Sequence, residues 1–327
     1  MQQLRVLKLL ADGGRHSGEA LARDLGITRA AVWKHVGKLD QWGLKVESRR
    51  GSGYRLSHAI DLLSREHILR GLDEAVAQRV AWLEVFPELD STNEHLLQAL
   101  PPPSGSLSVC LAEFQRAGRG RRGRRWNAPF GGGLCLSVGW CFAEMPRDLP
   151  ALPLATGVVV RRVIHAETGR RPSLKWPNDL VWEDRKLGGI LVEVSAECQG
   201  RCHVVIGIGV NVAVGSDWLE TISDRPGGAV DLYRMTAGRP PSRNVLASRL
   251  LEGLTELLVG FQSGGFKRHH AEFVSAHYLQ GREVAVLDGE LSVSGKVVTV
   301  DPDGALVLRT ATGIRRIISG DVSVRPA

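Results

Sequence analysis

A stretch of arginine and glycine between Gln115 and Trp126 contains the residues of this sequence whose types point most directly to chemistry. It has no acidic residue, and its six arginines are Arg116, Arg119, Arg121, Arg122, Arg124 and Arg125. Arginine carries a permanent charge on a planar group that grips phosphate or carboxylate at two points, and glycine lets the backbone approach a ligand closely. We therefore predict an anion-binding loop that becomes ordered around its ligand.

The alternative for this stretch is a solvated basic loop or a nucleic-acid-binding tail. Its neighbours disfavour that alternative, because the apolar runs 107–112 and 131–138 are typical of buried strands and place the loop at the edge of a folded sheet. The loop is not a P-loop, since Gly-x-x-x-x-Gly-Lys-Ser/Thr is absent. The run Gly207-Ile-Gly-Val-Asn211 lacks the third glycine of a dinucleotide-binding fingerprint.

The composition is that of a globular protein with several domains. With 327 residues, 43% of them hydrophobic and 24% charged, the chain is long enough for two or three domains. We expect a cytoplasmic protein without a membrane partner, because no apolar run approaches a span of about 18 residues and the amino terminus lacks a signal-peptide pattern. The five cysteines are odd in number and contain no Cys-x-x-Cys, which predicts reduced thiols and no zinc site. They are Cys110, Cys135, Cys141, Cys198 and Cys202.

Positive charge is concentrated in the first unit, which we place at residues 1–60. Residues 1–58 hold eleven Lys and Arg against five Asp and Glu, a net charge of +6 within a whole-chain value of +7. Ser17 and Thr28 are placed to cap two helices joined at Gly26, and a hairpin follows at 45–56, which is the pattern of a winged helix-turn-helix. We predict that this unit binds operator DNA; the alternative is a three-helix packing or dimerisation module. The predicted DNA contacts are Arg29, Trp33, Lys34, Arg49, Arg50 and Arg55.

The remaining chain divides into two further units. Residues 61–272 mix strand-like and helical segments, which predicts an α+β domain with a mixed sheet and helices on one face. Within it, 223–239 contains three glycines and reads as a mobile surface loop. Residues 273–327 contain short strands separated by Asp-Gly and Thr-Gly turns, which predicts a small SH3-like β-barrel.

Five motifs occur in a fixed order through the central unit. They are Asp90-Ser-Thr-Asn93, the arginine loop with Gly-Arg-Gly-Arg-Arg-Gly-Arg at 118–124, Lys175-Trp-Pro-Asn-Asp179, Lys186-Leu-Gly-Gly-Ile-Leu-Val-Glu193 and Gly207-Ile-Gly-Val-Asn211. In sequence, order and spacing they closely resemble biotin–protein ligases. With the winged helix in front, the chain resembles the bifunctional bacterial type, which is both ligase and biotin-operon repressor. Gly188 departs from members that carry alanine there.

The resemblance implies a reaction in two steps. Biotin's carboxylate attacks the α-phosphate of ATP with magnesium, giving biotinyl-5′-AMP and pyrophosphate, and a lysine of a biotin carboxyl carrier protein then takes the biotin. It also implies that biotinyl-5′-AMP acts as corepressor and promotes a homodimer. Two alternatives stay open: a repressor that only senses biotin, and a relative that acts on lipoate or octanoate. The filled catalytic positions disfavour the first, and the arginine loop and carboxy-terminal unit disfavour the second.

The resemblance assigns roles to individual residues. Lys186 and Arg121 are the predicted catalytic residues, with Lys186 bridging the biotin carboxylate and the α-phosphate. Binding of biotin or its adenylate falls to Ser91, Thr92, Asn93, Gln115, Arg119, Gly120, Arg121, Trp126, Lys186 and Asn211. Simpler alternatives are a helix cap for Ser91 or Thr92, a core position for Trp126 and a turn role for Asn211. Asp179 is a candidate magnesium ligand or the partner of Lys175, with a structural salt bridge as its alternative.

Overall fold

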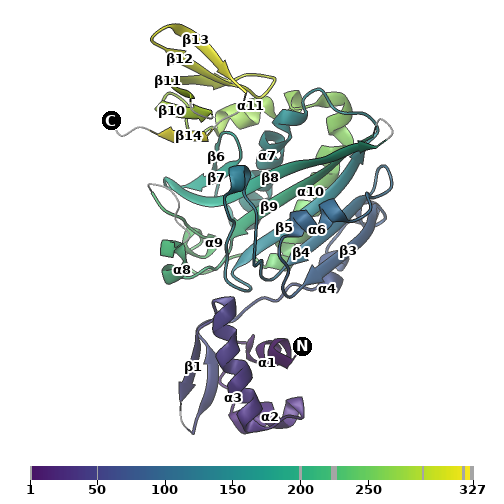
Figure 1. Cartoon of the computed structure of the whole chain (residues 1–327), viewed down its shortest axis with the longest axis vertical. Helices are drawn as coiled ribbons and strands as arrows, with labels where there is room; N and C mark the ends of the chain where they lie inside the picture. Colours follow the sequence, from purple (N-terminus) through teal and green to yellow (C-terminus); the bar gives the residue numbers. More distant parts are fainter. Residues whose placement is uncertain are drawn as a thin grey trace.

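The computed structural model describes residues 2–49, 51–198, 201–221, 227–288, 291–318 and 321–324. Three units follow one another along the longest axis of the molecule. The amino-terminal unit lies at one end, the central sheet in the middle and a small carboxy-terminal sheet at the other end (Figure 1).

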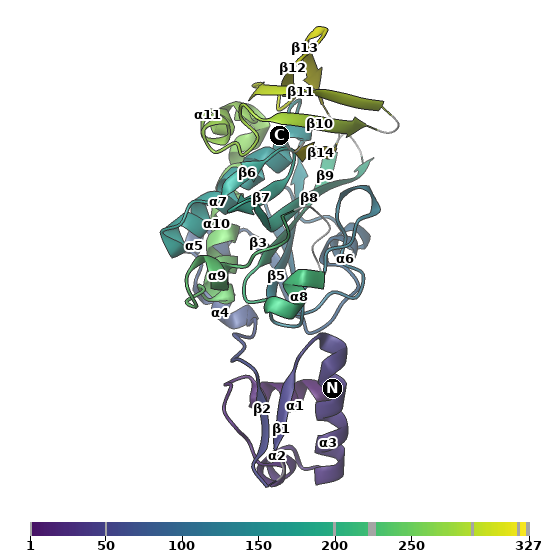
Figure 2. The same ribbon diagram turned by 90° about the vertical axis from the view of Figure 1, so that its left-hand side faces the viewer.

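The first unit is a winged helix-turn-helix, as predicted. Its elements are α1 (Gln2–Leu10), α2 (Gly18–Leu25), α3 (Arg29–Gly37), η1 (Lys38–Trp42), β1 (Val46–Arg49) and β2 (Gly53–Leu56). Both predicted caps are present, because Ser17 Oγ accepts from Ala20 N at 3.0 Å and Thr28 Oγ1 accepts from Ala31 N at 3.2 Å. Antiparallel pairing of β1 with β2 forms the wing beside α3 (Figure 2).

The central unit is built on a seven-stranded mixed sheet in the order β3-β4-β5-β9-β8-β7-β6. Only β3 and β4 pair in parallel among its strand pairs within the described residues. The strands are β3 (Val80–Phe86), β4 (Leu107–Ala112), β5 (Gly133–Phe142), β6 (Ser173–Lys175), β7 (Asp179–Trp182), β8 (Arg185–Cys198) and β9 (Arg201–Asn211). The helical elements of this unit are α4 (Arg65–Arg70), α5 (Glu74–Ala77), α6 (Thr92–Gln98), η2 (Arg121–Gly123), η3 (Leu149–Ala151), α7 (Leu152–Thr168), α8 (Ser216–Thr221), α9 (Leu232–Met235), α10 (Arg243–Gly264) and α11 (Lys267–Ser275).

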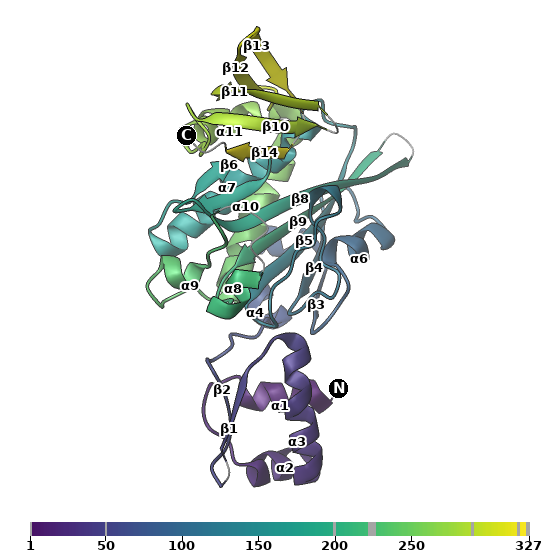
Figure 3. The ribbon, with the colours of Figure 1, turned by 60° about the vertical axis from the view of Figure 1, so that its left-hand side comes forward.

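The two long helices α7 and α10 cover one face of this sheet, where the main hydrophobic core lies (Figure 3). The short helix α6 covers the other face: its Leu96 packs with Cys110 and Val205, whereas Val109 and Leu111 face the main core. Alternate residues of β4 therefore point to opposite layers, as a strand requires. The segment Leu149–Thr168, which includes α7, is long and apolar enough to cross a membrane by length and composition alone, and most of α7 is buried in this core.

The prediction of a surface loop at 223–239 is wrong for its central part. Residues 222–226 lie outside the described residues, but Ala229 pairs with Lys186 and α9 follows directly. Leu232 and Met235 of α9 are buried in the main core. Burial of Leu232 and Met235 therefore outweighs the turn-forming glycines around them.

The carboxy-terminal unit is a five-stranded antiparallel sheet in the order β13-β12-β11-β10-β14. Its strands are β10 (Glu283–Asp288), β11 (Leu291–Val300), β12 (Leu306–Thr310), β13 (Gly313–Ile317) and β14 (Asp321–Val324). Within the described residues the two outer strands, β13 and β14, do not pair with each other, so closure into a barrel stays a prediction. Trp176 Nε1 donates to Gly304 O at 2.9 Å and ties this sheet to the central unit.

Candidate functional site

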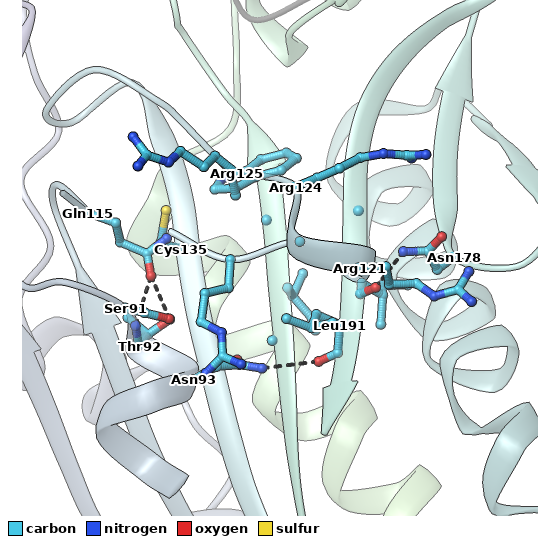
Figure 4. Close-up of a pocket in the computed structure, with 18 of the residues that line it drawn as sticks. Ser91, Thr92, Asn93, Gln115, Arg121, Arg124, Arg125, Cys135, Asn178 and Leu191 are labelled. Atoms are coloured by element: carbon cyan, nitrogen blue, oxygen red, sulfur yellow. Dashed lines mark hydrogen bonds between the residues drawn. The ribbon is translucent and has the colours of Figure 1, made fainter. Parts of the chain in front are cut away.

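One pocket on the α6 side of the central sheet gathers most of the predicted ligand residues (Figure 4). Nine of the ten predicted binding residues line it: Ser91, Thr92, Asn93, Gln115, Arg119, Gly120, Arg121, Trp126 and Lys186. They come from the start of α6, the arginine loop and the start of β8, which are far apart in the sequence. The sheet brings them together because β5, β9 and β8 are neighbouring strands.

Glycines on β9 make room for the side chains that enter this pocket. A Cβ on Gly209 would lie 2.4 Å from Cε2 of Trp126, and one on Gly207 would lie 2.2 Å from Oδ1 of Asn93. Both distances are shorter than real contacts allow. The glycines of the Gly207–Asn211 motif therefore seat Trp126 and Asn93 against the strand, without any dinucleotide-binding turn.

The arginine loop folds back on itself as a small hairpin. Gly120 N donates to Arg124 O at 2.7 Å, and Trp126 N donates to Gly118 O at 2.8 Å. Arg122 with φ 55° and Gly123 with φ 73° form its tip in the left-handed region. This geometry turns the loop toward the pocket.

The side chains of the loop have different surroundings. Arg124 and Arg125 line the pocket together with Arg119 and Arg121, although only the latter two are among the predicted binding residues (Figure 4). Arg122 Nη1 instead donates to Leu287 O of the carboxy-terminal sheet at 3.1 Å.

Neutral polar groups form one end of the pocket. Ser91 caps α6 by accepting from Glu94 N at 3.4 Å and also lines the pocket, so both of its predicted roles are compatible with the fold. Gln115 Oε1 accepts from Thr92 N at 2.8 Å and from Thr92 Oγ1 at 3.1 Å (Figure 4). These contacts fix donors and acceptors in a nearly dry recess, because Ser91, Thr92 and Gln115 are all buried.

A fixed cation forms the other end. Lys186 Nζ lies 3.3 Å from Asp179 Oδ1 and 5.7 Å from the centroid of the Trp126 ring. Asp179 is only 4% exposed, so this is a buried carboxylate beside a partly buried ammonium group. The backbone of Lys186 is also held, because Lys186 N donates to Gly228 O at 3.0 Å and its carbonyl accepts from Val230 N at 2.9 Å. Asp179 therefore has the geometry of a salt bridge with Lys186, which agrees with the structural alternative given for it above.

Asn211 is the predicted ligand residue that does not line the pocket. It is 1% exposed, and its Nδ2 donates to Val230 O at 3.0 Å, a contact between distant segments; its ligand role and the turn alternative both stay predictions. Cys135 and Asn178 line the pocket and are absent from the predicted set. The period of two along β5 is the signal for Cys135, because Ser137 on the same face contacts Thr92. Burial raises the pKa of the Cys135 thiol to about 11, so this thiol is neutral.

The donor set of the pocket does not form a resident metal centre. Within the described residues there is no group of three or more His, Cys, Asp or Glu side chains that could hold a metal ion. Asp179 is the pocket carboxylate, and it is paired with Lys186. One carboxylate suits a magnesium ion that enters on nucleotide phosphates, since magnesium takes few protein ligands when phosphates are present.

The first unit presents the predicted DNA-binding face. Arg29, Lys34 and Arg49 are exposed, and Trp33 on α3 is 70% exposed. Arg55 instead forms an ion pair within the wing, because its Nη2 lies 3.4 Å from Glu47 Oε1 on the neighbouring strand. Arg50 lies outside the described residues. The exposed basic groups on α3 and on the wing therefore share one unit, which is the arrangement of a winged-helix DNA contact.

Family models match all three units of the chain. Residues 85–211 match the Biotin/lipoate A/B protein ligase family, residues 2–55 match an HTH domain and residues 280–325 match the Biotin protein ligase C terminal domain.

Relatives of similar length extend the likeness to the whole chain. The bifunctional ligase/repressor BirA of Escherichia coli is 36% identical over 99% of this chain and 97% of its own length. The protein of the same name from Bacillus subtilis is 30% identical over 98% and 97%. Among solved structures, the biotin protein ligase of Aquifex aeolicus in complex with biotin and ATP superposes with a TM-score of 0.62 at 31% identity, covering 76% of this chain and all of that one.

Proposed function

Since this chain belongs to the family of bifunctional biotin ligases and repressors, it is a biotin–protein ligase with a DNA-binding unit, and we propose a role for each residue of its pocket. Its substrates are biotin and ATP, and its protein substrate is a carboxyl carrier protein. The observation that carries the residue assignment is the meeting of Lys186, the arginine loop and the Ser91–Asn93 segment in one pocket.

Adenylation joins two anions, so its main physical problem is electrostatic. The biotin carboxylate and the α-phosphate repel each other, and negative charge grows on the phosphate oxygens in the transition state. Lys186 bridges the two groups, and Asp179 and Trp126 hold its ammonium group in place at 3.3 Å and 5.7 Å. A magnesium ion bound with ATP would supply further neutralisation of the phosphate charge. The biotin oxygen displaces pyrophosphate from the α-phosphorus, giving biotinyl-5′-AMP.

Recognition of biotin falls to the neutral end of the pocket. A ureido ring offers two N–H donors and one carbonyl acceptor, so it requires acceptors and donors side by side. Ser91, Thr92, Asn93 and Gln115 supply both, and the contacts between Thr92 and Gln115 fix their directions. Arg119, Gly120 and Arg121 then close over biotin and the acyl phosphate. The enclosed anhydride is kept from water until a carrier lysine attacks its carbonyl carbon and AMP leaves.

Repression requires more than one winged helix. A single unit covers one half-site, and operators recognised by such proteins usually contain two related by dimer symmetry. We propose that biotinyl-5′-AMP promotes a homodimer through the central unit, so that biotin supply controls DNA binding in the cytoplasm. The carrier protein would compete for the same face, so a chain that still has substrate to modify would be withheld from DNA.

A direct test offers the purified protein ATP, magnesium and one acid at a time: biotin, lipoate or octanoate. Mass spectrometry then identifies the acyl-adenylate, and a carrier protein added afterwards reports transfer. Biotinyl-5′-AMP followed by a biotinylated carrier is the expected result. Adenylate formed only from lipoate or octanoate, or biotin binding without any adenylate, would overturn the proposed substrate assignment.

A further inference from the structure

Glu193 is the last residue of the Lys186–Glu193 motif, and the reaction steps above give it no task. It lies on β8, where Gly189 and Leu191 face the pocket. Side chains alternate along a strand, so Glu193 is the next residue on the same face, one step beyond the pocket. Its side chain is 19% exposed. A carboxylate this close to an anion-binding site needs a physical reason, because it opposes the binding of negative charge.

Both carboxylate oxygens of Glu193 are used by residues of the pocket. Arg119 Nη2 of the arginine loop lies 2.7 Å from Oε1, and Asn93 Nδ2 of α6 donates to Oε2 at 2.9 Å. Arg119 comes from the arginine loop and Asn93 from α6, two segments that also touch where Thr92 N donates to Gln115 Oε1. Glu193 therefore joins the loop that covers the pocket to the helix that forms its neutral end.

The charge of Glu193 also sets the direction of a hydrogen-bond chain. An ionised carboxylate only accepts, so Asn93 must turn its NH2 group toward it and its Oδ1 away. Ser137 Oγ lies 2.6 Å from that Oδ1 and 2.7 Å from Thr92 Oγ1, and its single hydrogen serves one of these two contacts at a time. These contacts link the arginine loop through Glu193 and Asn93 to Ser137 and Thr92. The backbone N–H of Thr92 then donates to Gln115 Oε1 at 2.8 Å. The carbonyl of Leu191, 3.3 Å from the same Nδ2, favours this orientation too, and Glu193 adds the charged acceptor at the shorter distance.

We propose that Glu193 is a positioning residue, which holds Arg119 over the pocket and fixes the amide orientation of Asn93. It touches neither biotin nor ATP and acts through these two neighbours. Its effect is on retention of biotin and of biotinyl-5′-AMP, because it orders groups that bind both ligands. It makes no interaction that is specific to the transition state, so the rate of the chemical step depends on it less. This inference rests on the proposed roles of Arg119 and Asn93.

The test is Glu193→Gln in the full chain, which keeps the volume and removes the charge. We expect biotin and biotinyl-5′-AMP to dissociate about tenfold faster and the KM for biotin to rise in proportion, with kcat for adenylation changed less than about twofold. Trypsin should cleave the arginine loop faster in the variant. The matched control is Glu272→Gln, which removes a carboxylate 2.7 Å from Arg162 between α7 and α11, far from the pocket in sequence and on a different layer.

A second variant separates positioning from a general loss of stability. In an Arg119→Gln background, Glu193→Gln should have a smaller effect, since one of its two contacts is already absent. Full additivity, or a Glu193→Gln enzyme that retains biotinyl-5′-AMP as well as the wild type does, would overturn the inference. A fall in kcat with unchanged KM would do the same. Failure of the wild-type chain to form biotinyl-5′-AMP would instead overturn the proposed function.

Discussion

Lys186 and Arg121 carry the same charge at the same pocket, but their surroundings give them different tasks. Lys186 is held on a strand by its backbone contacts and by a buried carboxylate, so its ammonium group is in place before substrates bind. Arg121 belongs to a hairpin loop that covers the pocket from outside the sheet. A fixed cation suits stabilisation of a transition state, whereas a cation on a loop suits retention of an intermediate.

Loss of the lysine should therefore slow chemistry more than it weakens binding. We predict that Lys186→Ala raises the adenylation barrier by about 2–4 kcal/mol, the range for loss of one donor to developing charge. Pre-steady-state adenylation and biotin titration measure the two effects separately. Arg185→Ala is the control, because Arg185 is adjacent and pairs with Glu183 at 3.4 Å. A near-normal adenylation rate in Lys186→Ala contradicts the assignment.

Loss of the arginine should release the intermediate. We predict that Arg121→Gly leaves the free energy of unfolding nearly unchanged, because removing a loop side chain outside the core seldom alters it by more than about 0.5 kcal/mol. Biotinyl-5′-AMP should then escape before transfer and label lysines of bystander proteins. Dissociation of the adenylate and biotinylation of an added unrelated protein are the measurements. Unchanged retention of biotinyl-5′-AMP argues against closure by Arg121.

At the scale of elements, the sequence predicts best where burial follows a simple period. The bounds of β4 coincide with the predicted apolar run 107–112, since this run is short and ends at polar residues. Helix α11 is not predicted. Phe273 is its single buried residue, and one residue does not show a helical repeat of buried positions. The strand β14 is also missed.

The pocket shows the same limit. Residue types and motifs identify nine residues that line it, but they do not show that Asp179 lies beside Lys186. That pairing depends on how β7 and β8 align, and their register shifts by one residue between Leu180 and Val181. Contacts between distant segments, such as Glu193 with Arg119, are likewise set by the sheet.

The junction of α11 with β6 should make the fold sensitive to acid. His277 is 6% exposed, its ring lies 5.4 Å from that of Phe273, and burial lowers its pKa from 6.5 to about 4. A folded-state pKa below the unfolded one means that stability is complete above pH 6.5 and falls as the pH drops toward 4. The loss amounts to at most about 3 kcal/mol. Denaturant titrations at several pH values should show that His277→Phe flattens this decline; an unchanged slope contradicts it.

At the scale of the whole molecule, the amino-terminal unit is joined to the catalytic unit by specific contacts. The Trp42 ring stacks on Phe130 at 4.6 Å, and Trp42 Nε1 donates to Glu88 Oε2 at 2.8 Å. Glu88 also pairs with Arg116, whose Nε lies 2.7 Å from Asp90 Oδ1 beside Ser91. Removal of the first unit would therefore expose Phe130 and disturb Arg116 at the start of the arginine loop. Surface substitutions in the full chain separate DNA binding from ligation more cleanly.

Lys34 and Arg49 suit that purpose, because both are exposed and lie on α3 and on the wing. Each phosphate contact changes the slope of log K against log salt by about 0.9, so the Lys34→Ala, Arg49→Ala double variant should weaken duplex binding and flatten the slope by about 2. Its ligation rate should match that of the wild type, since neither residue lines the pocket.

Fluorescence anisotropy over a salt series, with and without biotinyl-5′-AMP, measures binding, and ultracentrifugation of the same samples measures the dimer. We expect the adenylate to strengthen DNA binding and dimerisation together in the wild type, and to keep promoting the dimer in the variant. If neither the DNA affinity nor the oligomeric state changes when biotinyl-5′-AMP is added, biotin does not control DNA binding by the winged helix.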